Sequence, residues 1–175
     1  MPKYTLDDVR KEYYRLDALC GVDTSYLDLR ISTRATSRYG YCHYTRKGGR
    51  LIPDYISITD FIFECEDQFW NTVRHEYAHA LVTIRTGRAH HHDNVWKAAC
   101  REIGCKPERL AKDEDAHAKS AKLKEEKLRY EVHCNSCGRV FKYMKAGPVV
   151  KALQAGSKTC TCPCGSHDFE LINLI

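Results

Sequence analysis

Apolar residues recur at helical spacing near the start of the chain. A first helix is predicted over residues 5–20, because Thr5 can cap it and Gly21 can end it. Its apolar stripe consists of Leu6, Val9, Tyr13, Leu16 and Leu19. Asp7 and Asp8 fall in the first turn, where the helix dipole favours negative charge. We therefore expect an amphipathic helix with one face against a core.

A longer helix is predicted between Phe61 and Thr86, a stretch that contains neither Gly nor Pro. Its buried stripe consists of Val73, Tyr77, Ala80 and Ile84. Asp60 can cap the segment that leads into this helix, and Gly87 stands where a C-cap is expected. A third, shorter helix is predicted over residues 95–103, before the helix-stopping Gly and Pro that follow.

Between the first two helices, apolar and polar residues alternate as they do in strands. Strands are predicted over residues 27–32, 38–45 and 51–58. The Gly-containing segment 47–50 is predicted to be a hairpin turn, and Pro53 fits an edge of the sheet. We expect a small antiparallel three-stranded sheet packed against the long helix, which makes the fold class α+β.

Composition indicates in which compartment of the cell the protein is located. The chain has 175 residues, 43% of them hydrophobic, and a mean hydropathy of −0.54. No apolar run approaches the roughly 18 residues of a membrane span, and the N-terminus lacks an apolar signal core. We therefore expect an intracellular protein with no membrane partner. In a reducing compartment, clusters among the 10 cysteines indicate metal ligands rather than disulfides.

The long helix contains the sequence His-Glu-x-x-His at residues 75–79. Residues four apart lie on the same face of a helix, so His75 and His79 can bind one metal ion. Glu76 lies about 100° round the helix, where it can reach a metal-bound water without binding the metal. Zinc bound by neutral imidazoles lowers the pKa of its water ligand, and Glu76 can take the proton. The arrangement is typical of peptide-bond hydrolysis. The alternative is a pair of core histidines.

A catalytic zinc ion usually has three protein ligands and one position for water. The third ligand must come from outside the His-Glu-x-x-His helix. The triplet His90, His91 and His92 follows soon after Gly87 and supplies candidates.

Five of the cysteines fall in the last part of the chain, in two clusters. Cys134 and Cys137 form a zinc knuckle, a tight turn that presents two thiolates. The second pair is either Cys162 with Cys164 or Cys160 with Cys164, and the turn Pro-Cys-Gly around Cys164 favours the former. Two knuckles predict a zinc ribbon, in which a structural zinc replaces a core. The alternative is free cysteines.

The net charge of +5 is concentrated in one region. Residues 119–158 carry ten basic and three acidic side chains, a local charge of +7, whereas residues 1–118 sum to zero. This distribution indicates a polyanionic partner, or otherwise a solvated lysine-rich face. Phe141 and Tyr143 alternate with basic residues there and could stack on unpaired bases, or could instead pack the strands of the ribbon.

The stretch from His75 to Trp96 resembles the SprT-like metalloprotease family, whose eukaryotic relative is Spartan. Family members have His-Glu-x-x-His, a spacer of about a dozen residues, and a His four positions before an aromatic residue. Here twelve residues separate His79 from His92, and Trp96 stands at the matching offset, so the resemblance selects His92 as third ligand. Bacterial members also carry a C-terminal zinc ribbon. The resemblance implies a zincin-like peptidase that degrades proteins trapped on DNA.

We therefore expect a metallopeptidase domain (1–105), a charged connector (106–129) and a zinc ribbon (130–175). One catalytic zinc would be bound by the three histidines, with Glu76 as the catalytic base, and one structural zinc by four cysteines. The expected partners are single-stranded or partly unpaired DNA and proteins on it, and a monomer in the cytoplasm or at the nucleoid is expected. The alternative is a DNA-binding zinc adaptor with little or no proteolytic activity.

Overall fold

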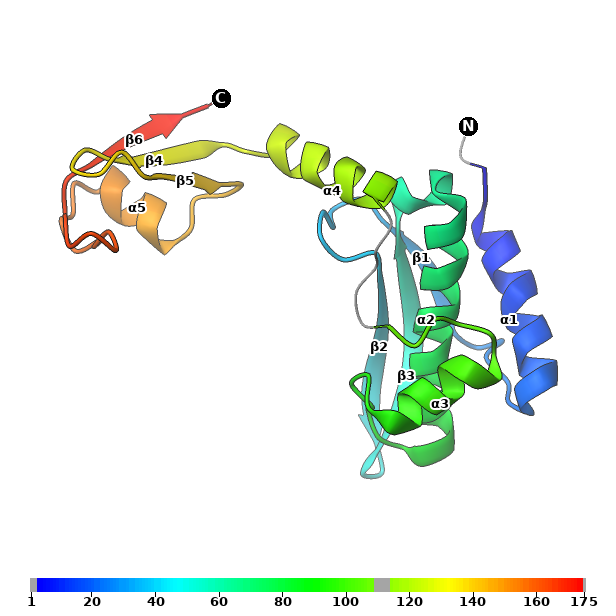
Figure 1. The fold of residues 1–175 in the computed structure, drawn as a ribbon. Coiled ribbons are helices and arrows are strands. Elements are labelled where there is room, and N and C mark those ends of the chain that lie inside the picture. Colours follow the sequence, from blue (N-terminus) through cyan, green and yellow to red (C-terminus); the bar gives the residue numbers. More distant parts are fainter. Residues whose placement is uncertain (1–2, 109–113, 175) are drawn as a thin grey trace. The chain divides into compact units, whose positions relative to one another are not determined.

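The computed structural model describes residues 3–108 and 114–174, and residues 109–113 of the predicted connector lie outside the described residues. The chain forms two compact units, Met1–Ser120 and Ala121–Ile175. Figure 1 shows helices packed on a small sheet in the first unit and a second small sheet in the other. The predicted mixture of helices and sheets is confirmed.

Helix α1 (Leu6–Cys20) begins and ends where the sequence predicts. The Thr5 side chain accepts from the backbone of Asp8, and the Asp8 carboxylate accepts from the Thr5 backbone at 2.9 Å. Gly21 closes the helix with φ of 65°, a left-handed conformation that favours glycine. The helix buries Val9, Tyr13 and Leu16 completely.

The sheet of the first unit contains β1 (Asp28–Ser32), β2 (Gly40–Lys47) and β3 (Arg50–Thr59), in the order β1-β3-β2. Strands β2 and β3 form the predicted antiparallel hairpin. Strand β1 runs parallel to β3, so the prediction of a fully antiparallel sheet is wrong. The chain crosses from β1 to the far edge and returns through the centre. Alternation shows which residues face the core, but it does not show which strands pair.

Pro53 lies in a part of β3 that pairs with only one neighbouring strand. Strand β3 is central, yet β1 pairs with it only from Tyr55 to Thr59. At Pro53 the strand pairs with β2 alone, and its partner Tyr44 adjoins a register shift. The prediction that Pro53 lies at an edge of the sheet is therefore wrong for the strand as a whole, although β3 has no β1 partner at this residue.

Helix α2 (Glu66–Thr86) packs against one face of the sheet and carries His75, Glu76 and His79. It begins later than predicted, because Asp60–Glu64 forms a separate 3-10 helix, η1, and Cys65 is extended. The absence of Gly and Pro does not mark where a helix starts. Gly87 ends α2 as predicted, with φ of 72° and its N–H donating to the Thr83 carbonyl at 2.7 Å.

Helix α3 (Asn94–Glu102) packs on α2 and places Trp96, Ala99 and Cys100 in the core. It is followed by helix α4 (Glu114–Glu126), for which the sequence shows no apolar stripe. Ala116 and Ser120 are nevertheless buried, and the Ser120 hydroxyl donates to the Thr36 carbonyl. Small residues form this contact, which explains why a hydrophobic pattern does not reveal it.

The second unit is built on an antiparallel sheet in the order β5-β4-β6, with β4 (Tyr130–Cys134), β5 (Val140–Tyr143) and β6 (Phe169–Asn173). Helix α5 (Pro148–Gln154), which the sequence analysis did not predict, lies between β5 and β6 in the chain and buries Val150. Among the described residues, no helix is long and apolar enough to cross a membrane.

Candidate metal centres

Contacts with α1 fix the orientation of α2. The Tyr77 hydroxyl donates to the Asp17 carboxylate at 2.8 Å, and the Tyr13 hydroxyl donates to the Val73 carbonyl at 3.2 Å. Both tyrosine side chains are fully buried. Because these contacts hold the back of α2 against α1, the opposite face of α2 is presented in a fixed direction.

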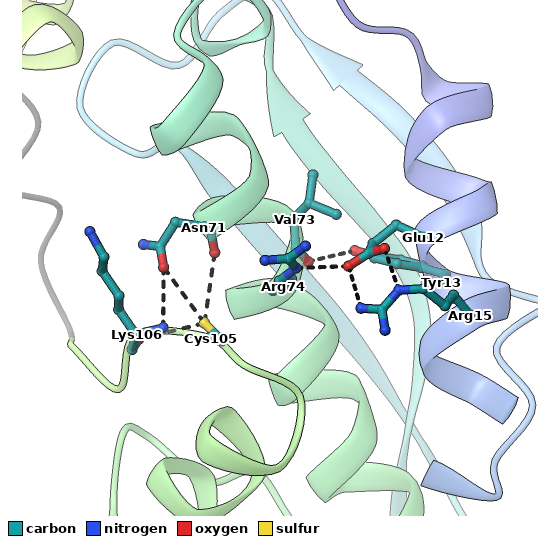
Figure 2. A network of polar contacts seen from close by, with 8 residues as sticks. All are labelled: Glu12, Tyr13, Arg15, Asn71, Val73, Arg74, Cys105 and Lys106. Atoms are coloured by element: carbon teal, nitrogen blue, oxygen red, sulfur yellow. Dashed lines mark hydrogen bonds and ion pairs between the residues drawn. The ribbon is translucent and has the colours of Figure 1, made fainter. Parts of the chain in front are cut away.

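Two polar contacts hold the middle of α2 from either side (Figure 2). Glu12 of α1 lies between Arg15 and Arg74, with its Oε1 accepting from the Arg74 Nε at 2.7 Å. On the other side, the Asn71 side chain accepts from the Lys106 N–H at 3.4 Å and contacts the Cys105 thiol at 3.8 Å. The segment after α3 is thereby tied to the turn of α2 that precedes the histidines.

The imidazole rings of His75 and His79, both on α2, lie close to the ring of His92. The Nε2 atom of His92 lies 3.0 Å from that of His75 and 3.2 Å from that of His79. Three nitrogens bound to one tetrahedral zinc at 2.0–2.1 Å would lie roughly 3.3–3.4 Å apart. The spacing therefore fits a single ion, and the donor set fits zinc. The role of the three histidines as ligands stays a prediction.

The protonation of the histidines suits metal binding. Burial lowers the pKa of His75 to about 4, and the neighbouring His92 adds to this effect. Burial also lowers the pKa of His79 to about 3, together with the adjacent histidines. Both imidazoles are therefore neutral near pH 7, and a neutral imidazole offers a lone pair to a cation.

Trp96 forms the wall behind the three imidazoles. Its ring centroid lies 4.7 Å from that of His75, 5.2 Å from that of His79 and 4.6 Å from that of His92. The indole is fully buried, so it has no room to move away from the three rings. Its position limits the rotamers of all three histidines.

His92 comes from the short loop between α2 and α3, and its backbone is unusual. Its φ is 63°, which makes it the one non-glycine residue with positive φ among those described. His90 spans this loop, since its Nδ1 contacts the Asp93 carboxylate at 2.7 Å and its Nε2 contacts the Thr86 hydroxyl at 3.2 Å. Asp93 in turn caps α3 by accepting from the N–H of Trp96 at 3.1 Å. The left-handed conformation costs about 1–3 kcal/mol, and these contacts hold it.

Glu76 lies next to the histidines and is only 6% exposed. Burial raises the pKa of its carboxyl group to about 8, against the opposing effects of Arg38 and of a backbone hydrogen bond from Cys42. Strand β2 covers this side chain closely: a Cβ atom on Gly40 would lie 2.6 Å from both Cγ and Oε1 of Glu76. The absence of a side chain at residue 40 therefore sets the position of the carboxyl group.

Gly40 was not among the site residues predicted from the sequence. The signal was present, because a glycine between Tyr39 and Tyr41 inside a predicted strand often marks a close backbone approach. What the sequence does not contain is the identity of the group that approaches, since that follows from the packing of β2 on α2.

The second unit brings four of its five cysteines together. The Sγ atoms of Cys134 and Cys164 are 3.6 Å apart, and those of Cys137 and Cys162 are 3.7 Å apart. Four thiolates around one zinc at about 2.3 Å would lie roughly 3.8 Å apart, so this cluster also fits an ion. Cys160 lies outside the cluster, with its Sγ 3.9 Å from the Val149 carbonyl.

Two thiols of the cluster differ in their acidity. Although a backbone hydrogen bond from Cys164 lowers the pKa of Cys162, burial and the neighbouring thiols raise it to about 12. Although burial raises the pKa of Cys134, the backbone N–H groups of Cys137 and Ser136 and the neighbouring thiols lower it to about 6. A thiolate is the form that binds a metal. The cluster is thus compatible with the predicted zinc ribbon.

Together, the geometry defines a class of protein: an α+β chain with three histidines that could hold a metal ion, two on one helix and one on the loop after it, a buried carboxyl group beside them, and a separate cysteine cluster. Comparison with protein families then identifies the group within that class. The model of the SprT-like family matches residues 10–117, and the chain belongs to this family. The match includes all three histidines and Glu76. A comparison with curated proteins gives no match.

Proposed function

We propose that the protein is a zinc-dependent endopeptidase that cleaves proteins bound or crosslinked to DNA inside the cell. The observation that supports this most is the convergence of three imidazole nitrogens beside a buried glutamate. Membership of the SprT-like family indicates a metalloprotease-like function. A purely structural metal site would gain nothing from a carboxyl group enclosed next to it.

In this proposal Glu76 moves protons. A zinc ion held by the three histidines would polarise the scissile carbonyl and lower the pKa of a bound water. Glu76 accepts the proton of the attacking water and then donates it to the nitrogen of the leaving amine. Its carboxylate form is favoured by the positive charge of a dication held nearby, which opposes the effect of burial.

We further propose that the C-terminal half, stabilised by a zinc ion at the four cysteines, binds the DNA. The local charge of +7 over residues 119–158 supports this role. Two of the ten basic side chains in this range have acidic partners: the Lys142 ammonium lies 3.6 Å from the Glu131 carboxylate, and the Lys119 ammonium lies 2.9 Å from the Glu64 carboxylate. Phe141 lies across from buried Val132 and is half-buried, which favours a packing role for its ring. Phosphate contacts therefore carry most of the proposed affinity.

The test is a cleavage assay on a DNA-bound protein substrate, with and without single-stranded DNA. Glu76→Gln keeps the size of the side chain but removes the base, so activity should fall by about 10²–10⁴-fold while zinc content stays constant. Single-stranded DNA should increase the cleavage rate of the wild-type chain. Activity retained in the variant would exclude Glu76 as the base. Strong DNA binding without any cleavage would instead identify a DNA-binding adaptor.

DNA binding itself is tested by its dependence on salt. Affinity should fall steeply with salt concentration, and Lys142→Gln with Lys145→Gln should reduce the slope by up to roughly one unit per lost phosphate contact. An unchanged slope would assign the DNA contacts to another surface.

A further inference from the structure

Strand β1 forms one edge of the sheet in the first unit. It pairs with β3 on one side, and no strand among the described residues pairs with it on the other. Alternate N–H and C=O groups of β1 therefore point away from the sheet. An edge of this kind is a template to which a further strand can be added.

An apolar groove lies beside this edge. It has a volume of about 500 Å³ and lies between the start of α1, the second half of β1 and the 3-10 helix η1. The apolar part of its lining consists of Tyr4, Leu6, Ile31 and Phe63. The volume falls within the range of roughly 300–1,000 Å³ that is usual for ligand pockets.

The position of Ile31 shows that the groove and the strand edge form one surface. Ile31 pairs with Ile58 of β3, and both side chains point to the side of the sheet on which the helices pack. Ile58 is completely buried, whereas Ile31 is 49% exposed because no further strand covers it. A strand added beside β1 would place every second side chain on this same side, over the groove.

The walls of the groove are held in place by aromatic packing. The Tyr4 ring stacks on the Phe69 ring with 4.7 Å between centroids. The Phe63 ring lies 4.9 Å from the same phenylalanine ring and is almost completely buried. Because the groove is formed before a ligand binds, little conformational entropy is lost from its walls on binding.

The charge beside the groove is negative. The two segments that flank it, residues 3–8 and 60–67, contain six acidic side chains and one basic side chain, which gives a local charge of −5. Three of the six carboxylates have a lysine ammonium within 4.0 Å. Asp7 and Asp60, which line the groove itself, are exposed and have no basic partner among the described residues. The rim of the groove therefore attracts a cation and repels a polyanion.

We propose that the β1 edge and the apolar groove, together called the β1 groove, bind an extended segment of a partner protein as an added strand. The segment places apolar side chains in the groove and carries lysine or arginine two residues away from them. Side chains two residues apart lie on the same side of a strand, so these cations reach Asp7 and Asp60 on the rim.

The chemistry of the β1 groove distinguishes this partner from others. In strand addition, main-chain hydrogen bonds supply affinity, and pockets for alternate side chains supply specificity. Nucleic acid and acidic peptides are disfavoured by the carboxylates of the rim. The chain as a whole carries a net charge of +5, so a basic peptide can bind only where the local charge is opposite. This inference goes beyond the proposed function and does not rest on peptidase activity.

The first experiment compares two peptides of equal composition. The probe is fluorescein-labelled Thr-Lys-Thr-Leu-Thr-Phe-Thr-Lys-Thr, in which the lysines share one side of the strand with Leu and Phe. The control is Lys-Thr-Thr-Leu-Thr-Phe-Thr-Thr-Lys, in which the lysines lie on the opposite side. Fluorescence anisotropy with the full chain should show at least about five-fold tighter binding of the probe. A version of the probe with glutamate in place of lysine should bind more weakly than both.

Variants of the chain test the two parts of the β1 groove separately. Ile31→Thr keeps a β-branched residue but removes apolar surface, so binding of the probe should weaken about five-fold. Val140→Thr is the matched control, because Val140 is 41% exposed in β5, which is also an edge strand. Asp7→Asn combined with Asp60→Asn should abolish the difference between probe and control peptide. Asp23→Asn, at an exposed position after α1, should preserve this difference.

Hydrogen exchange of the wild-type chain gives a readout that needs no variant to fold. Saturation with the probe should slow exchange of the β1 amides. Protection confined to other segments, equal affinity for all three peptides, or wild-type affinity in Ile31→Thr would overturn the proposal. A dimer of the chain that Ile31→Thr dissociates would assign the edge to a second copy and would also overturn it. None of these results would affect the cleavage assay with Glu76→Gln.

Discussion

At the scale of single residues, the position of the Glu76 carboxyl group depends on the absence of a side chain at Gly40. A methyl group at residue 40 would overlap Cγ and Oε1 of Glu76. The methyl group would also lie 2.8 Å from Cγ2 of buried Thr72. The Glu76 side chain can rotate aside, so Gly40→Ala should displace the carboxyl group rather than unfold the protein. We expect a loss of stability of about 1–3 kcal/mol. We also expect peptidase activity to fall about 10²-fold, as for a misplaced catalytic group.

The measurement combines zinc content, thermal unfolding and cleavage rate in Gly40→Ala. Zinc content should remain that of the wild type, because the glycine contacts Glu76 and not the histidines. Full activity in this variant would mean that the carboxyl group tolerates displacement, and Glu76 could then not act as a positioned base.

The neighbouring histidines of the triplet should differ in their effect. His90→Ala removes both contacts that hold the strained loop, so zinc affinity should fall by about ten-fold, as is usual for a residue that orients a ligand. His91→Ala changes an exposed side chain in the same loop and should leave affinity unchanged. Competition with a chelator measures both. Equal affinities would show that the conformation of His92 does not depend on His90.

At the scale of elements, Glu12 joins α1 to α2. Although burial raises the pKa of Glu12, hydrogen bonds from Arg15 and Arg74 hold it below its usual value. A carboxyl group with a lowered pKa in the folded state contributes stability above its unfolded pKa of about 4.3, and loses it as pH falls through the folded pKa. Glu12→Gln should therefore cost about 1.5–3 kcal/mol at pH 7 and much less in acid.

Urea unfolding of the wild type and of Glu12→Gln at pH 7 and near pH 3 measures this difference. Glu66→Gln serves as control, since its partner Lys3 is 57% exposed and the pair should contribute little at either pH. A destabilisation by Glu12→Gln that is the same at both pH values would assign the effect to packing rather than to charge.

Helical elements were predictable because their signals are local. The caps of α1 and the C-terminus of α2 lie at the predicted residues, Thr5 and Gly87. The parallel pairing of β1 with β3 was not predictable, since it depends on which strand of the β2–β3 hairpin lies next to β1. The 3-10 segment before α2 was missed because its composition resembles that of the helix.

The same distinction applies to the site. The spacing of His75 and His79 within one helix is readable from sequence, whereas the position of His92 depends on a loop with positive φ. Its selection from the triplet therefore required the family pattern. Gly40 is distant in sequence from Glu76, and its contact with it arises only when the sheet packs on α2.

At the scale of the whole molecule, two separate clusters predict about two zinc ions per chain. Cys162→Ser should reduce the content to about one and destabilise the second unit, because a site with three thiolates binds zinc less tightly. Cys160→Ser should keep both ions, since Cys160 lies outside the cluster. Metal analysis checks these numbers. Loss of zinc in Cys160→Ser would mean that this residue replaces another ligand.

Loss of zinc from the cysteine cluster should not affect the activity of the histidine centre. The histidine centre lies within Met1–Ser120 and the cysteine cluster within Ala121–Ile175. Cleavage of a short peptide in the absence of DNA should therefore survive Cys162→Ser, while DNA-stimulated cleavage should not. Loss of both activities would show that the second unit contributes to the site itself.

The buried indole behind the histidines also makes the protein its own spectroscopic reporter. The chain has two tryptophans, and Trp96 lies about 5 Å from each of the three imidazoles, between 4.6 and 5.2 Å. A paramagnetic ion such as Co²⁺ bound by these rings would quench its fluorescence. Trp70 packs against Tyr4 and Phe69 instead and supplies a constant background. Occupancy of the histidine centre can thus be followed by emission in the unlabelled chain, separately from the second unit, which contains no tryptophan.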